Sequence, residues 1–179
     1  MVGEARPGYE LWRPNRAKAS SQLMRLVVML LMVVSIALML IVIFGGWTVL
    51  NGGGYWGTIS LGIVFVYALL TVMVGRWSRG AITISVALAV LMLIFAAIGF
   101  ESWFARDKAG FTEAALPSDL LGLVTFLLIP VQIALAVAAS IAVKQEWHVE
   151  EERPIGSGDS GTTGDFGSDS AGSAAPNAT

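Results

Sequence analysis

The stretch LVVMLLMVVSIALMLIVIF, residues 26–44, contains no charged side chain, and Ser35 is its one polar residue. About 20 helical residues, each rising about 1.5 Å, cross the roughly 30 Å hydrocarbon core of a bilayer. Extended to residue 50, the stretch has several residues to spare for tilt. It is longer than the core of a cleaved signal peptide, and no small-residue cleavage site follows it. It therefore predicts a retained transmembrane helix.

Three further stretches share this composition. The 179-residue chain is 55% hydrophobic and 13% charged, with a mean hydropathy of +0.72, whereas soluble domains are about 25% charged. We therefore predict an all-α integral membrane protein, an antiparallel bundle of four transmembrane helices. Short connections predict that the first three spans are successive neighbours. The expected organisation is a basic N-terminal flank (1–25), a membrane domain (26–143, with spans at 26–50, 55–74, 81–100 and 120–143), an acidic juxtamembrane segment (144–154) and a disordered tail (155–179).

The distribution of Lys and Arg predicts the orientation. Cytoplasmic connections carry an excess of these residues. With both termini in the cytoplasm, nine basic residues are cytoplasmic, and only Arg106 and Lys108 are external. The opposite orientation inverts that count. We therefore expect a protein of the plasma membrane with both termini in the cytoplasm.

Tryptophan occurs near the ends of the predicted spans. Its amphipathic ring favours the headgroup layer of a bilayer. We therefore interpret five of the six tryptophans as interfacial anchors of the spans: Trp47, Trp56, Trp77, Trp103 and Trp147.

The spans lack the groups that most membrane chemistry requires. No Asp, Glu, Lys, Arg or His lies inside them, and the chain has no Cys and one His. Small four-span drug exporters are similar in size and hydropathy, but that family relies on a glutamate in its first span. Four-span thiol oxidases need cysteine pairs, and four-span haem proteins need paired histidines. We expect no catalytic residue, no cofactor and no metal site, because a hydrolase also needs a base beside its nucleophile.

Pro130 and Gln132 interrupt the last span. Proline bends a transmembrane helix and frees a backbone carbonyl, here that of Phe126, and an amide can bond to a neighbouring helix. Small residues repeat every four positions near them and in the third span, which lets helix backbones approach closely. We favour a helix-packing role, with a polar site lining a passage as the alternative. The candidate residues are Pro130, Gln132, Ala136 and Ser140 in the last span and Ala81, Ser85 and Ala89 in the third.

These patterns leave two functional classes open. The uncharged spans favour a non-catalytic accessory or scaffold protein that binds partners. The alternative is a small transporter or channel subunit, in which several copies form a path for a neutral or lipid-like solute. As partners we expect the lipid bilayer, and either other membrane proteins or further copies of the chain. The net charge of −2 gives no support to a nucleic-acid partner.

Overall fold

The computed structural model describes residues 7–52, 54–106, 113–145, 147 and 149–155. These residues belong to two units. A helical unit lies within Arg13–Glu150, and a small ribbon is formed by segments of Met1–Trp12 and Glu151–Thr179. The predicted disordered tail lies, from residue 156 onward, outside the described residues.

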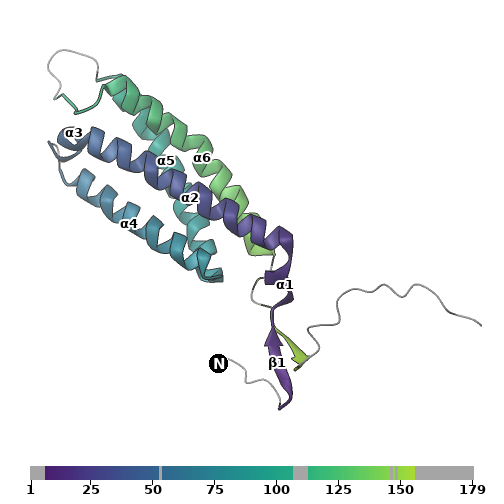
Figure 1. Ribbon diagram of the computed structural model, residues 1–179. Coiled ribbons are helices and arrows are strands. Elements are labelled where there is room, and N and C mark those ends of the chain that lie inside the picture. Colours follow the sequence, from purple (N-terminus) through teal and green to yellow (C-terminus); the bar gives the residue numbers. More distant parts are fainter. Residues whose placement is uncertain (1–6, 53, 107–112, 146, 148, 156–179) are drawn as a thin grey trace, which may run out of the picture. The chain divides into compact units, whose positions relative to one another are not determined.

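The helical unit contains four long helices (Figure 1): α2 (Ala19–Gly45), α4 (Trp56–Gly75), α5 (Arg79–Phe104) and α6 (Ser118–Lys144). Each is long and apolar enough to cross a membrane. Two short helices, α1 (Pro14–Ala17) and α3 (Trp47–Gly52), flank α2. The protein is therefore a four-helix integral membrane protein, as its sequence predicts.

The first span differs most from its predicted limits. Helix α2 begins at residue 19 rather than 26 and ends at Gly45, and residues 47–52 form the separate helix α3. The break falls at Gly46, where a Cβ would lie only 2.4 Å from Cη2 of Trp103. Close contact between this backbone and the Trp103 ring therefore requires glycine at the break between α2 and α3.

The four long helices pack in the cyclic order α2, α4, α5, α6, and the closeness of contact differs around this cycle. Helix α5 packs most closely on α6, whereas α4 contacts α5 least, although a short turn connects the two. The prediction that spans one to three are successive neighbours therefore describes α2 and α4 better than α4 and α5. We call the loose contact between α4 and α5 the α4–α5 seam.

Side-chain size accounts for this difference. The buried face of α5 is lined by the small residues Ala81, Ser85 and Ala89, so the backbone of α6 can approach closely. The buried face of α4 instead carries bulky side chains. These side chains take up more space than the small residues of α5, so α4 packs less closely on its neighbours than α5 packs on α6.

The ribbon consists of two antiparallel strands, β1 (Tyr9–Trp12) and β2 (Glu151–Pro154). Glu10 pairs with Arg153 across the ribbon, and the Arg153 guanidinium lies 5.3 Å from the centre of the Trp12 ring. Such pairs stabilise a two-stranded sheet, which is otherwise marginal in water. The sequence analysis did not anticipate either strand, because their pairing joins segments about 140 residues apart in the chain.

Candidate functional site

A hydrogen bond between Tyr67 and Gln132 connects α4 and α6 through the middle of the bundle. The Tyr67 hydroxyl donates to Oε1 of Gln132 at 2.9 Å, and both side chains are 0% exposed. Within the described part of the chain, Nε2 of Gln132 has no partner. The sequence analysis singled out Gln132 but missed Tyr67. The available signal was a tyrosine deep inside a span, far from the interface that this residue favours.

Three buried serine and threonine hydroxyl groups in the bundle bond within their own helices. Ser35, Ser85 and Thr125 each donate to the carbonyl four residues earlier, at 2.7–2.8 Å. These bonds satisfy the hydroxyl groups without a ligand, although the Ser85 hydroxyl also lies 3.9 Å from Sδ of Met32 on α2.

The small-residue stripe expected on α6 is not buried as one face. Ser140 is exposed and donates to the carbonyl of Ala136, which is itself partly exposed. A spacing of four residues advances by about 40° per step relative to a helix with 3.6 residues per turn. Ser140 therefore lies about 80° around the helix from Gln132. The buried face instead follows Gln132, Leu135, Ala139 and Ala142.

Pro130 lies on the exposed side of α6. The helix runs unbroken from Ser118 to Lys144 with the proline inside it. Phe126, whose carbonyl loses its helical donor, is also half exposed. Pro130 and Gln132 therefore occupy different faces of the helix, and only Gln132 lies in the interior.

The five expected anchor tryptophans have different environments. Trp47 and Trp56 are exposed, whereas Trp103 and Trp147 are buried and Trp77 is partly buried. The rings of Trp77 and Trp147 pack together at one end of the bundle, and the ring of Trp103 lies at the other end. We call the end with the α4–α5 turn the Trp77 end, and the opposite end the α3 end.

Arginine and tryptophan side chains hold the Trp77 end together. Trp77 has the unusual φ angle of 63°, and its ring packs edge-to-face with Trp147 at 4.9 Å between centroids. The Arg25 guanidinium lies 4.3 Å from the Trp77 centroid and donates to the Gly75 carbonyl at 3.2 Å. A positive φ is costly for a bulky residue. These contacts offset that cost.

Two further arginines bring the segments before α2 and after α6 together at this end. Nε of Arg16 donates to the Trp147 carbonyl at 3.1 Å, and Arg13 forms an ion pair with Glu150. Burial lowers the pKa of Arg16 from its usual value, the charge of Arg13 lowers it further, and Glu150 acts in the opposite direction. The Arg16 guanidinium nevertheless remains charged, because arginine keeps its proton in proteins. The Trp77 end therefore has a structural role.

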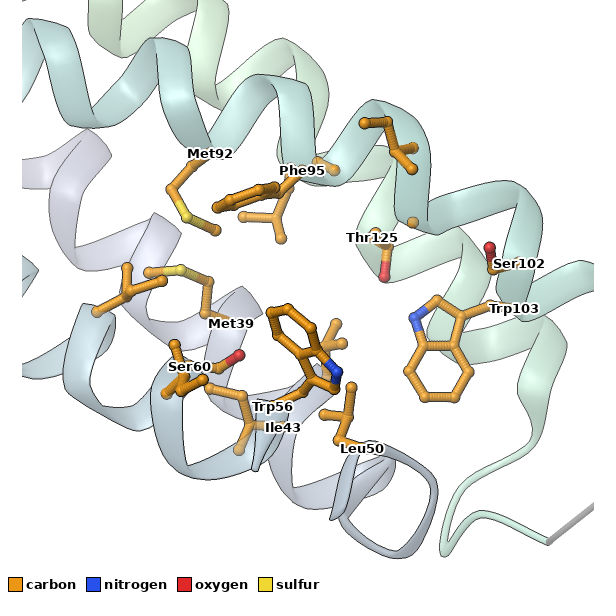
Figure 2. Close-up of a pocket in the computed structure, with 17 residues that line it drawn as sticks. Met39, Ile43, Leu50, Trp56, Ser60, Met92, Phe95, Ser102, Trp103 and Thr125 are labelled. Atoms are coloured by element: carbon orange, nitrogen blue, oxygen red, sulfur yellow. The ribbon is translucent and has the colours of Figure 1, made fainter. Parts of the chain in front are cut away.

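The candidate binding site is a cavity of about 560 Å³ between α4 and α5, near the α3 end (Figure 2). Ile43 of α2, Ala96 of α5 and Leu128 of α6 contribute buried lining, while Trp56 of α4 and Ile98 of α5 are 62% and 68% exposed. The cavity is therefore deepest toward α2 and α6 and opens where the exposed rim residues lie. It coincides with the α4–α5 seam, where the helices are least closely packed.

The lining of the cavity is apolar, with a few neutral hydrogen-bonding groups. Its polar side chains are the hydroxyls of Ser60, Ser102 and Thr125 and the indoles of Trp56 and Trp103. None of the lining side chains, all of which are described, is charged. In Figure 2 the nitrogen atoms of the two indoles face each other across the same end of the cavity. The sequence analysis missed this site, because its lining comes from five separate segments of chain.

In the described part of the chain, acidic side chains do not gather into a site. Within residues 7–52, 54–106, 113–145 and the few described after them, no three such residues lie close enough to hold a metal ion. The chain matches no protein family, no curated protein and no solved structure. The fold and the cavity therefore define the class: a four-helix integral membrane protein with an uncharged, largely apolar cavity at one end.

The Tyr67–Gln132 bond predicts coupled effects on stability. Tyr67→Phe leaves Oε1 of Gln132 without a donor, and Gln132→Leu leaves the phenol without an acceptor. We expect each to lower the free energy of unfolding by roughly 0.6–2 kcal/mol. The double variant should recover most of this loss, because neither polar group then remains unpaired.

Unfolding in mixed detergent micelles, followed by circular dichroism, measures these losses. Ser140→Ala, on the exposed side of α6, is the matched control and should leave the unfolding midpoint unchanged. If the two single losses simply add in the double variant, the side chains do not interact.

Proposed function

We propose that this protein is a non-catalytic membrane protein that binds a neutral, lipid-like molecule in its cavity. The observation that carries the proposal is an uncharged cavity of about 560 Å³ with exposed apolar residues at its rim. Ligand cavities in proteins measure about 300–1,000 Å³ and are lined mainly by apolar groups with a few polar ones. Charged solutes pay a high desolvation cost in such surroundings.

The position of the cavity supports a ligand that arrives from the bilayer. Trp56, Ile59 and Ile98 belong to membrane-spanning helices and are each more than half exposed. In a membrane, such exposed apolar side chains face lipid. A lipid-like molecule dissolved in the bilayer therefore reaches the cavity sideways, without crossing water.

The chemistry of the lining supports a non-catalytic role. Its hydroxyl groups belong to Ser60, Ser102 and Thr125, and that of Thr125 already donates to the Leu121 carbonyl. A nucleophilic hydroxyl needs a base within hydrogen-bonding distance, and the described lining contains no His, Lys or carboxylate. This proposal takes the neutral, lipid-like solute from the transporter alternative but requires no path through several copies.

Gly99 provides the test of this binding site. It lines the cavity, and a Cβ there would meet only Cγ2 of Thr125, at 3.9 Å. Gly99→Leu should therefore fill the cavity without disturbing the backbone. We expect covalent labelling of the cavity by a long-chain alcohol with a terminal diazirine to fall roughly tenfold, as steric overlap of 1–3 kcal/mol implies.

The matched control is Gly62→Leu on the exposed side of α4, where a Cβ meets nothing within 4 Å. Labelled peptides are identified by mass spectrometry after irradiation in liposomes. Equal labelling of residues around the cavity in the Gly99→Leu and Gly62→Leu variants would contradict the proposal.

A partner-binding, accessory role is the second candidate, and the ribbon is the observation that favours it. Tyr9 and Leu11 lie on the same face of β1, and both side chains are more than one third exposed. A two-stranded ribbon also has unpaired strand edges, to which another chain can add a strand. An accessory protein could therefore use the ribbon to hold a partner outside the membrane.

The double variant Tyr9→Ser/Leu11→Ser removes this apolar face and tests the accessory role. We expect it to lose the protein cross-links that the wild-type chain forms in intact cells. Ile155→Ser, an exposed apolar position just after β2, is the control. If the double variant forms the same cross-links as the wild type, the ribbon binds no partner.

The charges at the two ends of the bundle support an orientation with the Trp77 end in the cytoplasm of the cell, at the plasma membrane. Described basic residues at that end are Arg13, Arg16, Lys18, Arg25, Arg76, Arg79 and Lys144, with one described acidic residue, Glu150. At the α3 end, Arg106 is accompanied by Glu101, Glu113 and Asp119. An excess of Lys and Arg is typical of the cytoplasmic side.

The absence of cysteine from the chain allows a direct test of orientation. A membrane-impermeant maleimide should label Gly52→Cys in intact cells, because residue 52 lies in open space in α3. It should label Lys144→Cys only after permeabilisation. The reverse pattern would show that the Trp77 end is external.

A further inference from the structure

We propose that the cavity holds a neutral amphiphile in one orientation, with its polar end between Trp56 and Trp103 and its hydrocarbon chain directed toward Met39 and Met92. This inference rests on the proposed function and adds the class of the ligand and its orientation. A long-chain alcohol or a neutral glyceride has the required chemistry.

The polarity of the cavity changes along its length, and this gradient determines the orientation. The indole nitrogens of Trp56 and Trp103 face each other at one end, with Ser102 beside Trp103 (Figure 2). Met39 and Met92 lie together at the other end. Indole N–H and hydroxyl groups bond to a neutral polar end, whereas the methionines offer only apolar contact and a weak acceptor. Ser60, drawn beside Met39, adds one hydroxyl near the methionines, so a reversed ligand would find fewer partners for its polar end than between the two indoles.

The depth of the cavity matches one leaflet of a bilayer. Met92 lies twelve residues before the end of α5 at Phe104, which is about 18 Å along the helix axis. Half the hydrocarbon thickness of a bilayer is about 15 Å. A ligand with its polar end beside Trp103 therefore keeps that end at headgroup level, and its chain reaches the middle of the membrane. An amphiphile in the surrounding leaflet already has this orientation.

The chemistry of the lining selects a neutral polar end. The charged residue nearest in sequence, Glu101, does not line the cavity. A carboxylate or phosphate entering the cavity would therefore lose water without gaining a positive partner. Met39 and Met92 adapt their shape easily, because methionine is unbranched and flexible. The cavity therefore discriminates by the charge of the polar end more than by the shape of the chain.

Quenching of tryptophan fluorescence by bromine tests the orientation. The probes are two hexadecanols, one brominated next to the hydroxyl end and the other near the chain terminus, each added to liposomes of unbrominated lipid. We define cavity-specific quenching as the part of the quenching that is lost in Gly99→Leu but kept in Gly62→Leu. Quenching by probe molecules in the surrounding lipid remains in both variants and is therefore not counted. We expect this cavity-specific quenching to be greater for bromine near the hydroxyl, and to diminish in Trp56→Phe.

The outcomes separate this inference from the proposed function. Greater cavity-specific quenching by bromine near the chain terminus overturns the orientation and leaves lipid-like binding intact. Equal cavity-specific quenching by the ionised brominated hexadecanoic acid overturns the selection of a neutral end. If no probe shows quenching that depends on Gly99, both this inference and the proposed function fail.

Discussion

The absence of water from the hydrocarbon core is the constraint on which the rest of this structure depends. Backbone amides at that depth find hydrogen-bond partners only within a helix or a closed barrel, and four long helices meet this requirement here. Side-chain hydroxyls follow the same rule, since Ser35, Ser85 and Thr125 each bond to their own helix. The Tyr67 hydroxyl instead bonds to Gln132 on another helix, and the Ser85 hydroxyl also has a weak contact with Sδ of Met32 on α2, at 3.9 Å.

Without a hydrophobic driving force between helices in lipid, closeness of packing depends on side-chain size. Ala81, Ser85 and Ala89 allow α5 to approach α6 closely, whereas the buried face of α4 carries Tyr67 and other bulky side chains, and α4 packs more closely on α2 than on α5. The α4–α5 seam is consequently the loosest in the bundle, and the cavity forms there. A property of the packing thus creates the site to which we assign ligand binding.

The tryptophans of this protein differ in their contacts and in their burial. Trp77 and Trp147 pack together with arginine side chains and close one end of the bundle. Trp103 packs against the backbone at Gly46 and also lines the cavity, while Trp56 forms part of its rim. All four lie near the ends of long helices, but burial and contacts separate Trp77 and Trp147 from the two that line the cavity.

The amino-acid sequence by itself determined the class of this protein, because each apolar stretch, such as residues 26–44, carries its own signal of length and composition. It also pointed to Gln132, since an amide deep in a span needs a partner. Only the tertiary structure decided that this partner is Tyr67, that Ser140 faces outward, and that residues 9–12 pair with residues 151–154. The cavity, too, is a feature that only the tertiary structure decided. Its lining depends on how each helix is rotated about its axis and on which neighbour it packs against. These relations arise between helices, and no single stretch of sequence contains them.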